Sequence, residues 1–187
     1  MGGLDWPLSR EDGKPLRFWA QIGFRDFTGK AKSKALPGDG AIAFFAGRTA
    51  AEARVIYIAD PGEAFSPVPD DLPPGGDFEF PFTESRDGAV ASPLRPLRLL
   101  PLGVKAEATF RERQSAYQKK SKTQDRLDYQ MFGLEREIQG GGYSPQAENH
   151  LLLQVTGGDG GLANFWLPPD ALKRRDFEAA FITCDHD

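Results

Sequence analysis

The sequence predicts an α+β protein built mainly from antiparallel β-sheet, with two or three helices on one side. Three observations support this prediction. The apolar runs are short, they are separated by many of the 21 glycines and 15 prolines of the 187-residue chain, and a helical period is clear only in its middle part. A chain of this length can bury one sizeable core, so we expect a single domain over residues 1–187.

The first predicted strands lie near the N-terminus. Residues 16–24 (LRFWAQIGF) alternate in character with period two, which predicts a strand. Residues 40–47 (GAIAFFAG) and 54–59 (RVIYIA) have the apolar, β-branched and aromatic composition of a strand pair. One face of the first strand is expected to carry Leu16, Phe18, Ala20, Ile22 and Phe24.

The middle of the chain is rich in turn residues and then becomes helical in pattern. Residues 60–76 predict a long connection, residues 77–82 a short additional strand, and the prolines of residues 89–102 argue against a central strand there. Residues 105–120 carry the clearest helical period, and a second apolar stripe at helical spacing continues over residues 121–134.

The C-terminal part, residues 149–185, predicts a strand, a tight turn, a strand, a small helix and a strand. Apolar runs at residues 151–155 and 162–167 flank the glycine cluster at 157–161, and a third run contains Phe181 and Ile182. The glycine cluster lacks the Gly-Lys-Ser/Thr ending of a phosphate-binding loop and lies between two strands, so we expect a hairpin turn there.

The two ends of the chain repeat one pattern. At each end of the chain, a first apolar run finishes with Gln and an apolar residue, a second apolar run begins with Gly, and a third apolar run finishes with Asp. We interpret this as two related three-strand units that bury their apolar faces against each other or continue one sheet; a chance similarity of two short meanders is the alternative. The corresponding residues are Gln21 and Gln154, Gly40 and Gly161, and residues 57–60 and 182–185.

Several segments together resemble the YwqG-like family, a bacterial family of domains of unknown function. They are GGL at 2–4, WP at 6–7, DGKPL at 12–16, FWAQI at 18–22, GAIAFF at 40–45, RVIY at 54–57, MFGL at 131–134, IQG at 138–140, LLLQV at 151–155 and NFWL at 164–167. The resemblance implies an α+β fold with antiparallel sheet, supplies no catalytic residues, and implies a partner of the toxin–immunity kind. Family members usually have more chain before the Gly-Gly-Leu segment, so either Met1 is a late start or this protein lacks an N-terminal element.

Composition excludes several classes of partner. The net charge of −4 gives no electrostatic reason to expect nucleic acid or an anionic membrane. The single Cys184 excludes an intramolecular disulfide and is typical of a reducing compartment. No apolar run approaches the roughly 20 residues that span a bilayer, and the polar N-terminus is not a secretory signal. We therefore predict a cytoplasmic protein with no nucleic-acid or membrane partner.

The sequence contains no clear catalytic motif. Its two histidines are His150 and His186, and a Gly-x-Ser-x-Gly elbow is absent. One cysteine and two histidines are too few soft ligands for a closed zinc site, although carboxylates alone leave other metals open. We expect no catalytic residues and no cofactor, so we consider an enzyme the less favoured reading. A triad of His150 with Ser144 and either Glu148 or Asp159 is the alternative.

Two binding hypotheses from different classes remain. The first is a non-enzymatic interaction module that docks an acidic protein partner through a basic stretch, for which a solvated helix face is the alternative. That stretch contains Arg111, Arg113, Lys119, Lys120 and Lys122. The second is a small-molecule-binding protein or an undetected hydrolase with a pocket between the two sheet units. Its predicted lining is Gln21, Trp19, Gln139, Tyr143, Gln154 and Trp166, and structural pairing of the glutamines is the alternative.

Overall fold

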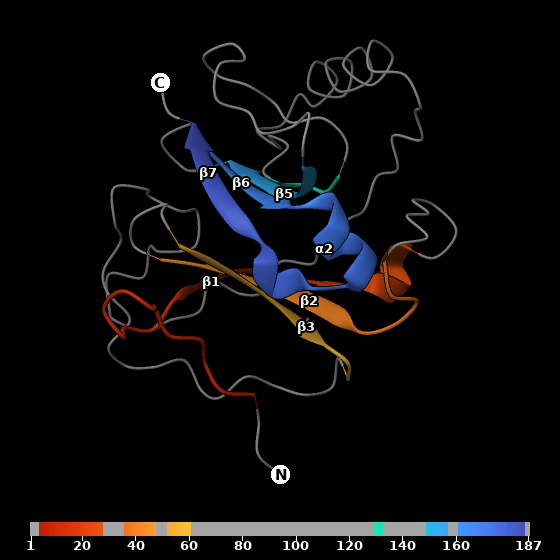
Figure 1. Cartoon of the computed structure of the whole chain (residues 1–187), viewed down its shortest axis with the longest axis horizontal. Helices are drawn as coiled ribbons and strands as arrows, with labels where there is room; N and C mark the ends of the chain where they lie inside the picture. Colours follow the sequence, from red (N-terminus) through yellow and green to blue (C-terminus); the bar gives the residue numbers. More distant parts are fainter. Residues whose placement is uncertain are drawn as a thin grey trace, which may run out of the picture.

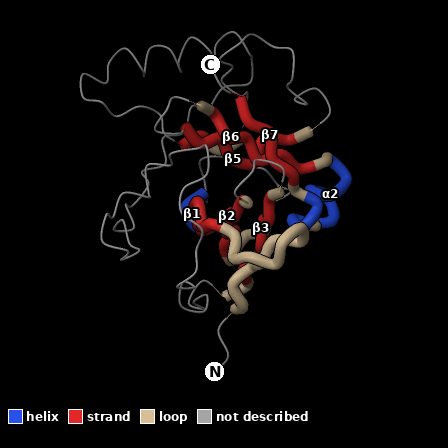
Figure 2. The backbone as a smooth tube through the Cα atoms, turned by 90° about the vertical axis from the view of Figure 1, so that its left-hand side faces the viewer, coloured by secondary structure: helices blue, strands red, loops and turns tan. Residues whose placement is uncertain are grey.

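The protein consists, over the part described by the computed structural model, of two antiparallel β-sheets that lie face to face (Figures 1 and 2). The described residues are 4–27, 36–47, 52–60, 129–132, 149–156 and 161–185. Two antiparallel three-strand units are therefore confirmed. The predictions for residues 61–128 and for the glycine turn at 157–160 lie outside the described residues.

The N-terminal sheet has the strand order β1-β2-β3. Every residue of the central strand β2 is buried, because β2 has a neighbouring strand on each side and apolar contacts on both faces. The three predicted N-terminal strands are thus confirmed. Their bounds are β1 (Arg17–Gly23), followed by the 3₁₀ helix η1 (Phe24–Phe27), β2 (Ala41–Ala46) and β3 (Ala53–Ile58).

The first strand does not keep the regular alternation that its sequence predicted. The pairing of β1 with β2 shifts between Phe18 and Ala20, which is a β-bulge at Trp19. Trp19 and Ala20 therefore both point into the core between the sheets, whereas Phe18 packs on the opposite face with Leu16. The single face predicted for Leu16, Phe18, Ala20, Ile22 and Phe24 is corrected to two faces that change at the bulge.

The C-terminal sheet has the strand order β4-β5-β6-β7. Its last three strands and the small helix follow the order predicted for residues 149–185, which is confirmed. Pro169 begins the helix at a position where its missing N–H costs nothing, and Arg175 ends it in the left-handed conformation. The elements are β4 (Tyr129–Gln130), β5 (His150–Thr156), β6 (Leu162–Leu167), α2 (Pro169–Arg174), the 3₁₀ helix η2 (Phe177–Ala179) and β7 (Phe181–Asp185).

The helical content differs from the prediction. Within the described residues α2 is the one α-helix, so this part of the protein is mainly β, and two or three helices on one side are not confirmed. The helical stripe predicted over residues 121–134 is wrong at its end. Residues 129 and 130 pair with β5, and Phe132 has a φ of 54°, which an α-helix does not contain.

The two sheets share one pairing register. The bulge at Trp19 in β1 recurs at Leu152 in β5, and beyond it Gln21 lies opposite Ala43 just as Gln154 lies opposite Asn164. The repeat seen in the sequence therefore corresponds to equivalent positions in the first two strands of each unit. In the third strand residues 55–58 correspond to 182–185, two residues away from the predicted match. A shift of two keeps every side chain on its face, so alternation could not reveal it.

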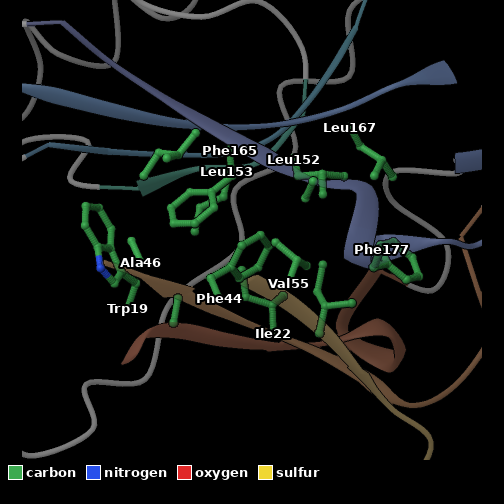
Figure 3. Close-up of a cluster of buried hydrophobic side chains, with 14 of the residues drawn as sticks. Trp19, Ile22, Phe44, Ala46, Val55, Leu152, Leu153, Phe165, Leu167 and Phe177 are labelled. Atoms are coloured by element: carbon green, nitrogen blue, oxygen red, sulfur yellow. The ribbon is translucent and has the colours of Figure 1, made fainter. Parts of the chain in front are cut away.

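The core fills the space between the two sheets (Figure 3). Phe44 and Phe165 occupy equivalent positions and contact each other edge to face, with ring centroids 5.2 Å apart. Burying each side chain of this size stabilises the fold by roughly 1.5–3 kcal/mol. Both sheets contribute to this core, through Trp19, Ile22, Phe44, Ala46 and Val55 on one side and Leu152, Leu153, Phe165 and Leu167 on the other, and Phe177 of η2 adds to it.

The outer face of the N-terminal sheet is covered by the chain's own N-terminal segment, residues 4–16 (Figure 1). The ring of Trp6 packs edge to face on Phe45 at 5.4 Å, and its Nε1 donates a hydrogen bond of 2.7 Å to the carbonyl oxygen of Leu16. Leu4 also packs against the apolar cluster on this face, which contains Leu16, Ala41, Ala43, Phe45 and Ile58. The part of this face around Phe45 is therefore closed by apolar contacts.

Gly40 directly precedes β2 and lies close to the backbone of β3. Its φ is +83°, and a Cβ placed there would lie 2.6 Å from the carbonyl oxygen of Ile58 and 2.8 Å from Cε2 of Tyr57. Its carbonyl oxygen accepts a 2.9 Å hydrogen bond from the amide of Phe24, which limits how far it can move. Glycine is thus required here by both conformation and space.

We predict that Gly40→Ala lowers the free energy of unfolding by about 2 kcal/mol or more, because the new Cβ meets backbone and the left-handed conformation is strained. Urea denaturation measures this change. Gly38→Ala is the matched control, since no atom lies within 4 Å of its added Cβ; its effect should stay within about 0.5 kcal/mol. Equal effects of the two substitutions would contradict the prediction.

Candidate functional site

Four polar side chains cross the outer face of the C-terminal sheet in directly opposed positions. Gln130 lies opposite Gln154, Gln154 opposite Asn164, and Asn164 opposite Thr183. Opposed residues of antiparallel strands share a face, and the neighbours of Gln154 and Asn164 along β5 and β6 point into the core. The four residues therefore form one line that faces away from the core, which we call the polar row.

The buried amides of the polar row have hydrogen-bond partners, one of them within the row. Gln154 is fully buried and Asn164 is 4% exposed, and Nε2 of Gln154 donates a 2.7 Å hydrogen bond to Oδ1 of Asn164. Gln130, also buried, donates from Nε2 to the carbonyl oxygen of Phe132 at 3.3 Å. A buried amide without a partner costs roughly 1–3 kcal/mol, so these pairings are needed to keep polar groups at this depth.

Trp166 extends the polar row along β6. Its side chain is on the same outer face, fully buried, and its Nε1 donates a 2.8 Å hydrogen bond to Oγ1 of Thr183. Tryptophan is a donor only, so this bond satisfies its single polar group. The bond also orients the Thr183 hydroxyl, because an oxygen that accepts from the indole directs its own hydrogen elsewhere.

The equivalent line on the N-terminal sheet is mostly apolar. Its positions are occupied by Gln21, Ala43 and Ile56, and Phe45 stands where Trp166 stands in the second unit. Ala43 and Phe45 belong to the apolar cluster under the N-terminal segment. The same strand register thus accepts apolar residues at two positions, so the fold does not require polar residues at Asn164 and Thr183.

Charge on this face is sparse. Among the described residues of the outer face, the one ionisable side chain is Asp185 of β7, and none is cationic. The pKa of Asp170 in α2 is lowered by a 3.0 Å hydrogen bond from Lys173. The pKa of Asp12 in the N-terminal segment is lowered by a hydrogen bond from the backbone amide of Lys14. Both carboxylates are in exposed local pairs and belong to other parts of the molecule.

The predicted pocket residues do not come together between the sheets. Trp19 is in the core there, edge to face with Phe165 at 5.4 Å. Gln21 is exposed on the outer face of the N-terminal sheet, whereas Gln154 and Trp166 lie on the outer face of the other sheet. The intersheet location of the pocket is therefore corrected, because apolar side chains fill that space. Gln154 and Trp166 remain on one face, where Gln154 belongs to the polar row and Trp166 adjoins it.

Several other predicted residues lie outside the described part of the chain. They are Gln139, Tyr143, the basic residues Arg111, Arg113, Lys119, Lys120 and Lys122, and the triad partners Ser144, Glu148 and Asp159. His150 is described, and it is an exposed residue at the start of β5. Its role as a catalytic base stays an alternative without geometric support from the described residues.

Sequence reasoning missed Gln130, Asn164 and Thr183. A signal existed for Asn164, because it is the single hydrogen-bonding side chain within the buried run LANFWL other than the indole of Trp166. Gln130 gave no such signal, since its strand has two residues. The described residues contain no group of three His, Cys, Asp or Glu side chains that could hold a metal ion. No helix within them is long and apolar enough to cross a membrane.

The described fold and site define a mainly β domain of two packed antiparallel sheets, with a neutral hydrogen-bonding row on one outer face. The chain belongs to the family described as a domain of unknown function (DUF1963), whose model matches residues 2–185. A comparison with curated proteins finds no match.

We predict that Thr183→Val lowers the free energy of unfolding by about 1–3 kcal/mol, because it leaves the buried Nε1 of Trp166 without an acceptor. Thr183→Ser keeps the acceptor oxygen and should cost clearly less. Urea denaturation of the two variants and wild type measures the difference. If valine and serine prove equivalent, the indole hydrogen bond does not contribute as described.

We predict that Asn164→Leu is more destabilising than its combination with Gln154→Leu. The single change removes the acceptor of Gln154 Nε2 and should cost about 1–3 kcal/mol, whereas replacing both amides by apolar groups removes donor and acceptor together. A double-mutant cycle based on urea denaturation measures the coupling. Additive effects of the two substitutions would show that the amides do not interact energetically.

Proposed function

We propose that the protein is a non-enzymatic binding module of the YwqG-like type that engages its partner through the polar row. The observation that carries this proposal is the line of Gln130, Gln154, Asn164 and Thr183 across four strands of one sheet face. The fold does not need Asn164 and Thr183 to be polar, because the equivalent positions of the N-terminal sheet are filled by Ala43 and Ile56. Keeping them polar is therefore best explained by a binding role.

The chemistry of the polar row favours binding over catalysis. Amide, hydroxyl and indole groups neither take up nor release protons near neutral pH, so they act by donating and accepting hydrogen bonds. A hydrolase acting at this face would need a nucleophile with a base in reach. The described hydrogen bond of the Thr183 hydroxyl is to Trp166 Nε1 and not to Asp185, the one described carboxylate of the face.

The partner that we propose is another protein of the bacterial cytoplasm, of the immunity-type pairing that the family resemblance implies. The basic stretch containing Arg111 and Lys119 would assist docking if that partner is acidic. A small molecule is the second candidate. It is kept because a few amide and hydroxyl groups are the polar groups that commonly fix the orientation of small ligands.

Co-purification with three forms of the full-length protein tests the proposal. Wild type, Gln154→Leu/Asn164→Leu and Gln21→Leu are immobilised in equal amounts and exposed to cytosol of the source bacterium, and bound proteins are quantified by mass spectrometry. Gln21 is the control because it holds the position equivalent to Gln154 on the other sheet. Near-UV circular dichroism verifies that the three forms have the same fold.

We expect one protein to be retained by wild type and by Gln21→Leu and to be depleted about tenfold or more with the double variant, a loss of about 1.4 kcal/mol of binding free energy. Equal retention by all three forms would mean that the polar row is not the binding face. A wild-type protein that retains no specific partner would contradict the protein–partner proposal and leave the small-molecule candidate.

A further inference from the structure

We infer that Asp39 is a site of covalent self-modification, at which the Asp-Gly bond just before β2 isomerises to isoaspartate. The inference is independent of the proposed function and concerns a part of the molecule away from the polar row. Two Asp-Gly pairs, Asp12-Gly13 and Asp39-Gly40, lie within the described residues. The structure engages the reacting groups of the first pair and leaves those of the second available.

The reaction needs an aspartic acid side chain, the next backbone amide and water. The backbone nitrogen of Gly40 attacks Cγ of Asp39, and the carboxyl hydroxyl leaves with the amide hydrogen as water, which closes a succinimide ring. Water then attacks the main-chain carbonyl carbon and opens the ring. The nitrogen stays bonded to Cγ, so the main chain now runs through Cβ. Glycine favours ring closure because it has no side chain to obstruct the approach of its nitrogen.

The Asp12-Gly13 pair is restrained at both of its reacting groups. The amide nitrogen of Gly13 donates a 3.0 Å hydrogen bond to the carbonyl oxygen of Ser9. Oδ1 of Asp12 accepts a 3.0 Å hydrogen bond from the amide of Lys14, and this bond lowers the pKa of the carboxyl group. A lowered pKa keeps the group ionised, and a carboxylate has no hydroxyl to leave as water. Ring closure at Asp12 must therefore first break these hydrogen bonds.

The Asp39-Gly40 pair has neither restraint. Asp39 is exposed, and within the described structure its carboxylate makes no hydrogen bond or ion pair and the amide of Gly40 donates no hydrogen bond. The preceding Gly38 is also exposed, and a Cβ placed on it would meet no atom within 4 Å. The backbone on that side therefore has room to rotate, and Cγ of Asp39 can reach the nitrogen of Gly40.

Isomerisation at Asp39 acts on a tightly packed junction. It adds one carbon atom to the main chain directly before Gly40, where even an added Cβ would lie 2.6 Å from the carbonyl oxygen of Ile58 and 2.8 Å from Cε2 of Tyr57. The carbonyl oxygen of Gly40 also accepts the 2.9 Å hydrogen bond from Phe24. The longer main chain shifts Gly40 relative to these neighbours, so we expect the modified protein to be less stable than the original.

Ageing of the full-length protein in neutral buffer tests the inference. Wild type and Asp39→Glu are sampled over time and digested with trypsin, which places the two Asp-Gly pairs on separate peptides, residues 11–17 and 35–48. Electron-transfer fragmentation in the mass spectrometer distinguishes isoaspartate from aspartate in each peptide, and unaged protein gives the background of the digestion. Asp39→Glu is the matched control, because it keeps the charge but would have to close a larger, less favourable ring.

We expect isoaspartate to accumulate at Asp39 at least about fivefold faster than at Asp12, the factor to which breaking one neutral hydrogen bond corresponds. Aged wild type should also contain a less stable population in urea denaturation, which aged Asp39→Glu should lack. The inference is overturned if no isoaspartate forms at Asp39 or if Asp12 reacts equally fast. Equal loss of stability in the two aged proteins would overturn the effect assigned to the junction at Gly40.

Discussion

The packing of two apolar sheet faces against each other is the interaction on which the rest of this structure depends. Phe44 and Phe165, at equivalent positions of the two units, meet near its centre, and Trp19 packs onto the same ring of Phe165. Either sheet alone would expose an apolar face to water at a cost of roughly 25 cal/mol per Å². The N-terminal and C-terminal parts of the chain therefore stabilise each other, although residues 61–128 separate them in sequence.

Because the core uses one face of each sheet, the two outer faces are left to differ. The N-terminal sheet is closed by residues 4–16 through apolar contacts centred on Trp6 and Phe45. The C-terminal sheet instead presents amides, a hydroxyl and an indole in hydrogen-bonded pairs. The two units thus differ in their outer faces although their strands pair in the same register. The outer face of the N-terminal sheet packs against the chain itself, and the outer face of the C-terminal sheet carries the hydrogen-bonding groups from which we infer binding.

The strands could be predicted because alternation and glycine punctuation are local properties of the chain. The bulge at Trp19 could not be predicted, because it depends on how β1 pairs with β2. It places Phe18 and Ala20 on opposite faces of the sheet. The intersheet pocket was wrong for a related reason: Trp19 and Trp166 look alike in sequence, yet one fills the core and the other pairs with Thr183. Gln154 was recognised as an amide that needs a partner, but that partner, Asn164, follows from cross-strand register alone.

The matching bulges at Trp19 and Leu152 have a consequence for how this chain can change over time. Each bulge lets two consecutive residues of its strand point inward, so each strand contains one residue more than its partner pairs. Removing that residue would turn the strand segment before it inside out, bringing Phe18 or Leu151 inward and Arg17 or His150 outward. Single substitutions along β1 and β5 can therefore accumulate one at a time, whereas the insertion or deletion of one residue in either strand would reverse the faces of its side chains.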